Sequence, residues 1–242
     1  MANSNHLAVL ERGRHAWDDW RRNNPSIIPD LSSADLRCRA LAGVNFFSAN
    51  LSRANLAYAR LESAKLDGAD LSYANLEGAN LRYADLEYAN AQGASLNQAD
   101  LTYSKIHHTH FERANLSGAR IDTGEAWGTH FEDANLQGAY LNCVKYRDIN
   151  FARANLRGAN LCYPTPQYSS IWGVVWTGAI LPDGSIYQES SRNSGGSSSK
   201  FETCPICQGS GWAPPKIHAN LPPPLAEALS VRCYNCSGLG FV

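Results

Sequence analysis

The sequence predicts an all-β solenoid, a chain that turns a corner every five residues and coils on itself. An apolar residue, mostly leucine, recurs at every fifth position from Leu31 to Leu181, and the residue two positions before it is mostly alanine. In an α-helix, five steps of about 100° would advance each leucine by roughly 140° and spread the leucines around the axis. A straight strand would send them to alternate faces. One corner per repeat cancels that reversal and keeps the apolar residues inside.

A second period, of twenty residues, predicts four sides per coil. Phe111, Phe131 and Phe151 lie twenty residues apart, whereas a three-sided coil would group Phe111 with Ala126 and Leu141. We call the recurring apolar residue the centre of its repeat. Five glycines, each two residues after a centre, are also separated by multiples of twenty residues: Gly78, Gly118, Gly138, Gly158 and Gly178. If neighbouring coils are about 4.8 Å apart, the leucine and alanine side chains pack against one another and fill the interior of the rod. This filled axis leaves little room for an internal active site.

The A(N/D)Lxx pattern of residues 30–182, seen clearly in "DLSYANLEGANLRYADLEYAN", resembles the pentapeptide-repeat family. The resemblance implies a right-handed, four-sided parallel β-helix in which the centre and minus-two residues face inward and the other three face solvent. The stretches "WDDWRRNNPSIIPDLS" and "TGAILPDG" resemble pentapeptide proteins of cyanobacteria. That second resemblance implies a role in assembling a photosynthetic or regulatory complex.

Three further segments flank the predicted β-helix. Residues 1–29 predict a helix that caps the open end of the solenoid, with a partner-binding amphipathic helix as the alternative. The residues that indicate this helix and its end are Leu7, Leu10, Trp17, Trp20 and Pro25. Residues 183–200 are predicted to be a turn and a flexible Ser/Gly linker. Residues 201–242 are then a separate small module.

Two CxxCxGxG units in residues 201–242, "CPICQGSG" and "CYNCSGLG", predict a zinc site. Four thiolates are a donor set for one tetrahedral structural Zn²⁺. A module of this size has too small a core to fold without a stabilising element such as a bound metal ion. The four predicted ligands are Cys204, Cys207, Cys233 and Cys236. A redox site at the CxxC pairs is the alternative.

The same units look like the cysteine-rich zinc region of DnaJ-type co-chaperones, which binds two zinc ions through four such units. This chain has two units, so the resemblance implies one zinc ion and the binding or assembly of client proteins. The chain has no J-domain signature, and stimulation of an Hsp70 partner is therefore not implied.

Four histidines in the predicted rod point outward in the four-sided register: His107, His108, His110 and His130. Histidine is a common metal ligand, but the sequence fixes no companion carboxylate or cysteine near them. We therefore expect plain solvated histidines, with an incidental metal site as the alternative.

Two outer columns predict contacts between coils. Tyr83 lies one coil before Tyr103, and Arg113, Asp133 and Arg153 form a charged ladder. Such pairs contribute about 0.2–1 kcal/mol each. An exposed tyrosine pair could alternatively anchor a protein partner, because it combines a large apolar area with a polar tip.

Composition and charge narrow the classes of function. The net charge is −1, so no general affinity for nucleic acid or anionic lipid is expected. The seven cysteines do not resemble a secreted disulfide framework, and no apolar run reaches about 18 residues. No nucleotide-binding, nucleophile-elbow or HExxH motif occurs. These features predict a cytoplasmic protein that is not an enzyme and has no transmembrane segment.

The predicted function is a protein–protein interaction scaffold or chaperone-like assembly factor that binds client proteins through the rod faces and the zinc module. One alternative is a DNA mimic that inhibits a topoisomerase. That role needs an acidic rod, whereas arginines are interspersed among the acids here. Another alternative is a thiol–disulfide redox factor that uses the CxxC pairs. The sequence specifies neither the client nor the oligomeric state.

Overall fold

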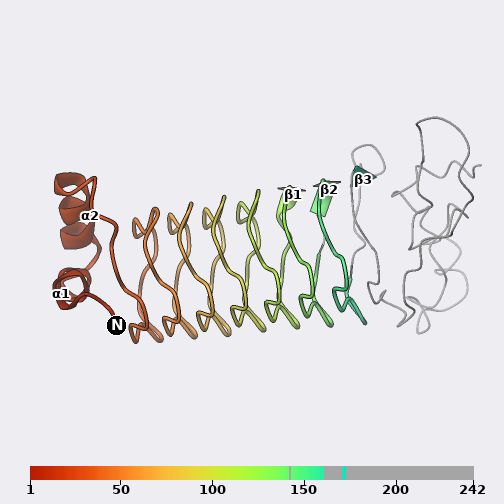
Figure 1. The fold of residues 1–242 in the computed structure, drawn as a ribbon, viewed down its shortest axis with the longest axis horizontal. Coiled ribbons are helices and arrows are strands. Elements are labelled where there is room, and N and C mark those ends of the chain that lie inside the picture. The colour runs from red at the N-terminus through yellow and green to blue at the C-terminus, as the bar shows by residue number, and fades with distance from the viewer. Residues whose placement is uncertain (142, 161–170, 173–242) are drawn as a thin grey trace, which may run out of the picture.

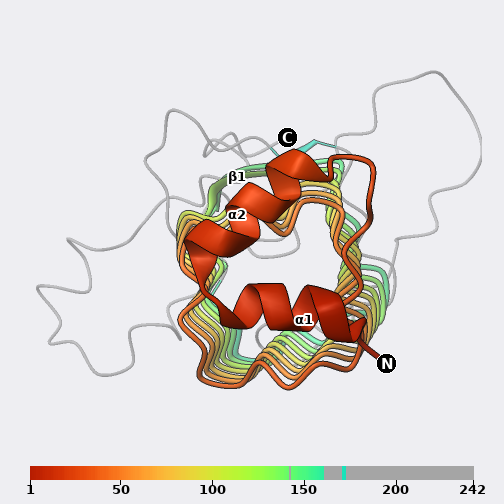
Figure 2. The same cartoon turned by 90° about the vertical axis from the view of Figure 1, so that its left-hand side faces the viewer.

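A computed structural model describes residues 1–141, 143–160 and 171–172, and these residues form a coiled rod with two helices at its N-terminal end (Figure 1). Seen along the axis, the coils superpose with a squared outline (Figure 2). The helices are α1 (Ser4–Glu11) and α2 (Arg14–Asn23). The strands are β1 (Gly124–Trp127), β2 (Cys143–Arg147) and β3 (Ile171–Trp172). Most other contacts between coils are isolated parallel bridges, because each side of a coil is short.

Parallel bridges join residues twenty apart, beginning with Asp30 and Asn50. Backbone hydrogen bonds run in both directions between coils. The Leu51 amide donates to the Asp70 carbonyl at 2.7 Å, and the Asp70 amide donates to the Ala49 carbonyl at 2.9 Å. A period of twenty residues with one corner every five residues gives four sides, as the column of phenylalanines predicts.

Most corners of the described coils are tight turns whose third residue has a left-handed backbone. The Ala54 amide donates to the Leu51 carbonyl at 3.0 Å, and Arg53 between them has a φ of 57°. A positive φ at this place is typical of a type II turn. A residue other than glycine costs about 1–2 kcal/mol in this conformation. Core packing and the bonds between coils therefore have to outweigh the cost at the corners.

The predicted inward residues fill the interior. Leu71 and Ala69 are both completely buried, and most of the other centre and minus-two residues of the described coils are as well. Phe111, Phe131 and Phe151 stack along the axis with ring centroids 5.3 and 5.2 Å apart. Each buried leucine or phenylalanine contributes about 1.5–3 kcal/mol to the free energy of unfolding.

Where a polar residue stands two positions before a centre, its hydroxyl group forms a hydrogen bond with a backbone carbonyl. The Thr109 hydroxyl donates to the Leu86 carbonyl and the Thr129 hydroxyl donates to the Ile106 carbonyl, both at 2.8 Å. Buried hydroxyls cost little when they are hydrogen-bonded in this way. Threonine can therefore replace alanine without opening the core.

The N-terminal segment holds two helices where a helical segment was expected, and Gly13, with a φ of 96°, separates them. The Asn3 side chain begins α1 by accepting from the amides of Asn5 (2.9 Å) and His6 (3.3 Å). Both helices lie across the end of the first coil (Figure 2). Trp17 in α2 is fully buried. It contacts the first coil edge-on, with its ring centroid 5.7 Å from that of Phe46.

Donors from this segment reach backbone carbonyls of the first coil. Within the rod, the equivalent carbonyls accept hydrogen bonds from backbone amides of the preceding coil. The first coil has no preceding coil. The bonds are Asn3 N to Asp30 O (2.9 Å), Trp17 Nε1 to Asn45 O (2.7 Å) and Arg21 Nη2 to Phe47 O (2.8 Å). These bonds satisfy carbonyls that an uncovered end would leave to water.

The coil between β2 and β3 departs from the four-sided rule. Tyr146 pairs with Ile171 and Arg147 pairs with Trp172, so the partners are twenty-five residues apart. The expectation of strict twenty-residue stacking is wrong here. One additional pentapeptide separates the two strands, and the five-residue apolar phase continues because a whole repeat is added.

Several predictions concern residues outside the described ranges. They include Pro164 and Pro166, the linker of residues 183–200 and the zinc module of residues 201–242. Of the two helices in the described part of the chain, neither has the length and apolar character needed to cross a membrane.

Candidate interaction surface

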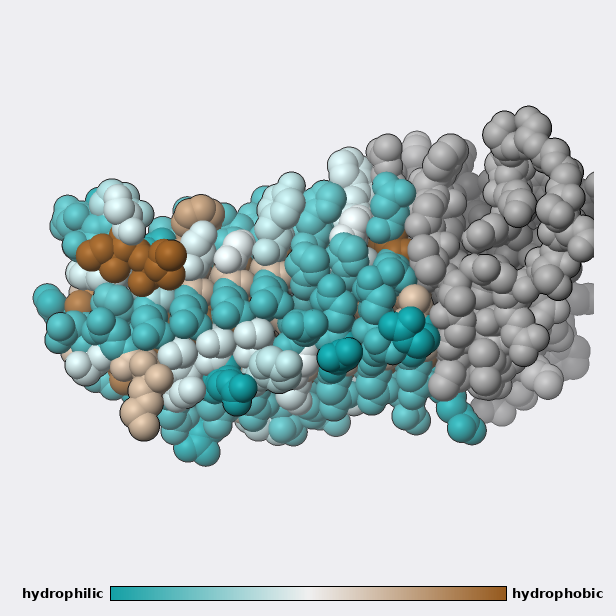
Figure 3. Space-filling model, viewed as in Figure 1, coloured by the Kyte–Doolittle hydropathy of each residue, from teal (hydrophilic) through white to brown (hydrophobic). Residues whose placement is uncertain are grey.

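The outer surface of the described part of the rod includes a depression that is open to solvent and is lined by Asp35, Arg37, Cys38 and Arg39. The side face in Figure 3 is mainly hydrophilic, with strongly hydrophobic residues at the helical end. Because the inward side chains are packed against one another, the candidate functional groups are those on the outside.

Tyrosines mark the corners of the rod. Five of them combine a positive φ with a side chain that is more than half exposed: Tyr58, Tyr73, Tyr83, Tyr88 and Tyr103. Two of the rings lie over a glycine of the next coil. A Cβ atom built on Gly78 would lie 2.5 Å from the Tyr58 ring, and one on Gly93 would lie 2.7 Å from the Tyr73 ring. These rings therefore stabilise the contact between neighbouring coils.

Tyr83 and Tyr103 form the predicted pair. Their rings are stacked, with centroids 5.3 Å apart and planes inclined by 20°. Both side chains stay exposed, at 56% and 58%. The Arg82 guanidinium lies 5.6 Å from the centroid of the Tyr83 ring. Tyrosine and arginine are enriched at protein interfaces, so this group is the strongest candidate for a partner contact.

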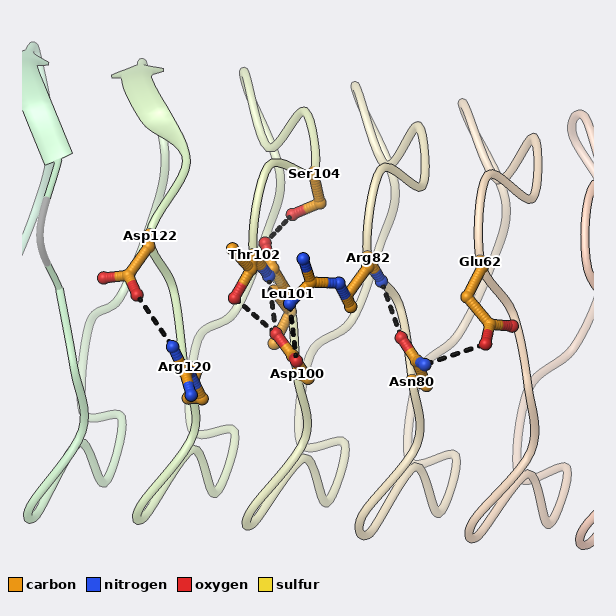
Figure 4. Close-up of polar contacts among 9 residues, drawn as sticks. All are labelled: Glu62, Asn80, Arg82, Asp100, Leu101, Thr102, Ser104, Arg120 and Asp122. Carbon is orange, nitrogen blue, oxygen red and sulfur yellow. Dashed lines mark hydrogen bonds and ion pairs between the residues drawn. The ribbon is translucent and has the colours of Figure 1, made fainter.

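A hydrogen-bonded network holds Arg82 in place (Figure 4). Its Nη1 atom lies 3.3 Å from Oδ2 of Asp100, whose carboxylate also accepts from the Thr102 amide at 2.9 Å. Burial raises the pKa of Asp100, but the hydrogen bonds from Thr102 and Arg82 outweigh it and lower that pKa below its ordinary value. The carboxylate is therefore ionised at neutral pH and orders the arginine beside Tyr83.

The network continues along the same side of the rod (Figure 4). The Asn80 side-chain amide donates to Glu62 at 2.8 Å, and Arg120 lies 3.7 Å from Asp122. The Asn80–Glu62 and Arg82–Asp100 contacts each link neighbouring coils, whereas Arg120 and Asp122 belong to the same repeat. This side presents ordered polar and aromatic groups, which reduces the entropy that a partner would have to remove.

At another corner, two members of the predicted charged ladder, Asp133 and Arg153, are in contact. Arg153 binds Asp133 with two contacts of 2.6 and 2.8 Å. The hydrogen bond from Arg153, together with its charge and that of Arg113, lowers the pKa of Asp133. Exposed ion pairs contribute little to stability. We therefore assign this ladder a small stabilising role.

The histidines do point outward, but the expectation that no carboxylate lies beside them is wrong. Nδ1 of His110 lies 2.8 Å from Oε1 of Glu112, and Nδ1 of His130 lies 3.2 Å from Oε1 of Glu132. Within each pair, both side chains flank an inward phenylalanine and lie on the same outer face. The signal in the sequence is the tetrapeptide THFE, which occurs at residues 109–112 and again twenty residues later.

The other two histidines pack against aromatic rings of neighbouring coils. His108 stacks on Tyr88 with centroids 5.0 Å apart, and His107 lies 5.2 Å from the ring of Trp127. Packing of this kind accounts for their orientation.

The four predicted zinc ligands, Cys204, Cys207, Cys233 and Cys236, lie outside the described residues. The zinc site therefore stays a prediction. Among the described residues, Cys38 is an exposed free thiol.

Comparison with known proteins identifies the family. The family model described as "Pentapeptide repeats" matches eight copies, over residues 45–82, 79–118 and 129–162. The chain belongs to the pentapeptide-repeat family, which implies a right-handed β-helix. No match was found among curated proteins.

Solved structures with the same kind of repeat are similar to this chain. HetL from Nostoc sp. PCC 7120, a protein involved in heterocyst differentiation regulation, is 29% identical over 64% of this chain and 76% of its own, with a TM-score of 0.32. The Nostoc protein alr5209 is 35% identical over 40% and 70% of the two chains, with a TM-score of 0.30. QnrB1, a plasmid-mediated fluoroquinolone resistance protein, is 18% identical over 56% and 78%, with a TM-score of 0.27.

Proposed function

We propose that the protein is a non-catalytic protein–protein interaction scaffold. The observation that carries this proposal is the contrast between the filled axis and the ordered exterior. The inward side chains are packed against one another, whereas Tyr83 and Tyr103 are stacked on the outside and remain more than half exposed. Catalysis favours a concave site that excludes water, and binding to a partner needs only a well-defined face.

The proposed contact is the tyrosine patch, which we define as Arg82, Tyr83, Asp100 and Tyr103. Two stacked rings supply apolar area at a low cost in conformational entropy, because tyrosine has few rotatable bonds. Asp100 holds Arg82 beside the rings, so the charged group is also ordered before a partner arrives. This preorganisation raises affinity without additional contacts.

The helical segment is proposed to act as a cap. An open solenoid end exposes unpaired backbone groups and an apolar cross-section, which favours end-to-end association. Trp17 covers the cross-section, and its Nε1 atom donates to the Asn45 carbonyl at 2.7 Å. The side faces are then left as the surfaces for partners.

The C-terminal module is proposed to be a second binding element that contains one structural Zn²⁺. The support is the spacing of its four cysteines, and zinc would act by folding the module. Joined through a flexible linker, the rod and the module would bind one client with an effective concentration of about millimolar. We expect Cys233→Ser to release zinc and unfold the module while the melting temperature of the rod stays constant. Simultaneous loss of both would contradict independent folding.

DNA mimicry is less well supported than a protein scaffold. Lys105 lies 3.0 Å from Asp85, and Arg153 binds Asp133, so basic side chains neutralise acidic ones along the rod. A mimic of duplex DNA needs a continuous negative surface. Inhibition of gyrase in a supercoiling assay would reverse this preference.

Affinity capture from native extract tests the scaffold proposal. The full chain is compared with a chain that ends at residue 200, and captured proteins are quantified by mass spectrometry. We expect a defined partner to bind the full chain and to bind the shortened chain more weakly, because one of two contacts is lost. The absence of a specific partner for both chains would refute the proposal.

A further inference from the structure

We propose that residues 109–112 and 129–132 form a binding site for a divalent transition-metal ion, with His110 and His130 as direct ligands. Both segments read THFE, and a parallel bridge joins His110 to His130. The two imidazole rings are stacked with centroids 4.8 Å apart and planes inclined by 4°. Ligand atoms of His110, Glu112 and His130 lie within 4.8 Å of one another.

Each imidazole is oriented by the carboxylate of its own repeat. Oε1 of Glu112 lies 2.8 Å from Nδ1 of His110, and Oε1 of Glu132 lies 3.2 Å from Nδ1 of His130. An ionised carboxylate can only accept, so Nδ1 carries the proton and the free lone pair lies on Nε2. Metal-binding histidines are held in the same way, with the other ring N–H donated to a carboxylate. This arrangement occurs here on two adjacent rings.

One shared ion requires the two rings to turn toward each other, because stacked, parallel imidazoles point their Nε2 lone pairs in nearly the same direction. A zinc–nitrogen bond is about 2.1 Å long, so a tetrahedral angle needs two nitrogens roughly 3.4 Å apart. Corresponding atoms of the two parallel rings are separated by about the centroid distance of 4.8 Å. The rings must therefore approach by about 1.4 Å. The side chains of His110 and His130 are 48% and 37% exposed, which leaves space on the solvent side for this movement.

The carboxylates also supply negative charge beside the rings. The Oε2 atoms of Glu112 and Glu132 are buried and have no hydrogen-bond partner in the described part of the chain. Asn150 donates to Oε1 of Glu132 and helps to hold that side chain. The negative charge of the two carboxylates favours a cation bound at the rings. Imidazole ligands favour Zn²⁺, Ni²⁺ or Cu²⁺ over Mg²⁺ or Ca²⁺.

Zinc uptake by the full chain tests the site, with Zn²⁺ alone as the probe. The wild type is compared by equilibrium dialysis with His110→Gln/His130→Gln, Glu112→Gln and the control His15→Gln, which removes an exposed histidine in α2. All four chains carry the same C-terminal cysteines, so zinc bound by those cysteines contributes equally to all four measurements. We expect the double variant to take up one equivalent less and Glu112→Gln to bind that equivalent about 10- to 100-fold more weakly. His15→Gln should match the wild type.

Equal uptake by all four chains would overturn the proposal. NMR of the wild-type imidazoles gives a second readout that does not depend on folding of the variants. We expect the signals of His110 and His130 to move as the zinc equivalent attributed to them binds, while that of His15 stays constant. Unmoved signals of His110 and His130 would also overturn it. Either outcome is separate from the scaffold proposal, which does not depend on this ion.

Discussion

Replacing Phe131 with alanine is the perturbation that probes the filled axis most severely. The side chain is 1% exposed and is stacked between the rings of Phe111 and Phe151 at 5.3 and 5.2 Å. Truncation of a buried phenylalanine costs about 3–5 kcal/mol, from lost transfer free energy and the cavity left behind. Rings on both sides resist collapse into that cavity, so we expect a value in the upper half of this range.

Leucine at the same position provides the matched control. Leu31, Leu51 and Leu71 occupy the equivalent place in earlier coils and are completely buried there. Phe131→Leu should therefore cost much less than Phe131→Ala. Urea unfolding followed by circular dichroism measures both free energies. A loss below about 1 kcal/mol for the alanine variant would refute a dry, close-packed axis, since only a hollow or hydrated interior could absorb that deletion.

Three other changes test separate features of the rod. Trp17→Ala should lower the free energy of unfolding by about 3–5 kcal/mol and promote end-to-end association, as seen by light scattering; a stable monomer would contradict the cap. Gly78→Ala should destabilise the rod more than Gly138→Ala in thermal melts, because both have a positive φ but only the first Cβ would strike the Tyr58 ring; equal losses would show that the ring contact is unimportant. The hydrogen bond from Arg37 lowers the pKa of Asp35 to about 2. The stabilising effect of that carboxylate is thus present above its unfolded pKa and is lost as pH falls toward 2. An NMR titration of Arg37→Gln should show a higher pKa for Asp35, and an unchanged value would contradict this cause.

The repeat fold is largely predictable because two periods encode it. The spacing of five excludes a helix and a straight strand, and the column Phe111, Phe131 and Phe151 selects four sides. The extra pentapeptide between β2 and β3 was not predictable from these periods. Adding a whole repeat preserves the five-residue phase, so Tyr146 and Ile171 look like members of an uninterrupted series.

The outer surface is less predictable than the core. Inward positions admit few residue types, whereas outward contacts depend on which side chains meet across neighbouring coils and within a repeat. The Tyr83–Tyr103 stack followed from the twenty-residue spacing alone. The contact between His110 and Glu112 joins residues two apart in one repeat, and only the turn geometry shows that both lie on the same outer face.

The most direct test of the scaffold account is a comparison of partner binding by two double variants. Tyr83→Ser/Tyr103→Ser removes the rings of the tyrosine patch, and Tyr58→Ser/Tyr73→Ser removes two equally exposed rings from other corners. The dissociation constant of the captured partner is measured for both variants and for the wild type. The account predicts much weaker binding by the first variant and nearly unchanged binding by the second, with both still folded. Equal affinity of all three chains would contradict it.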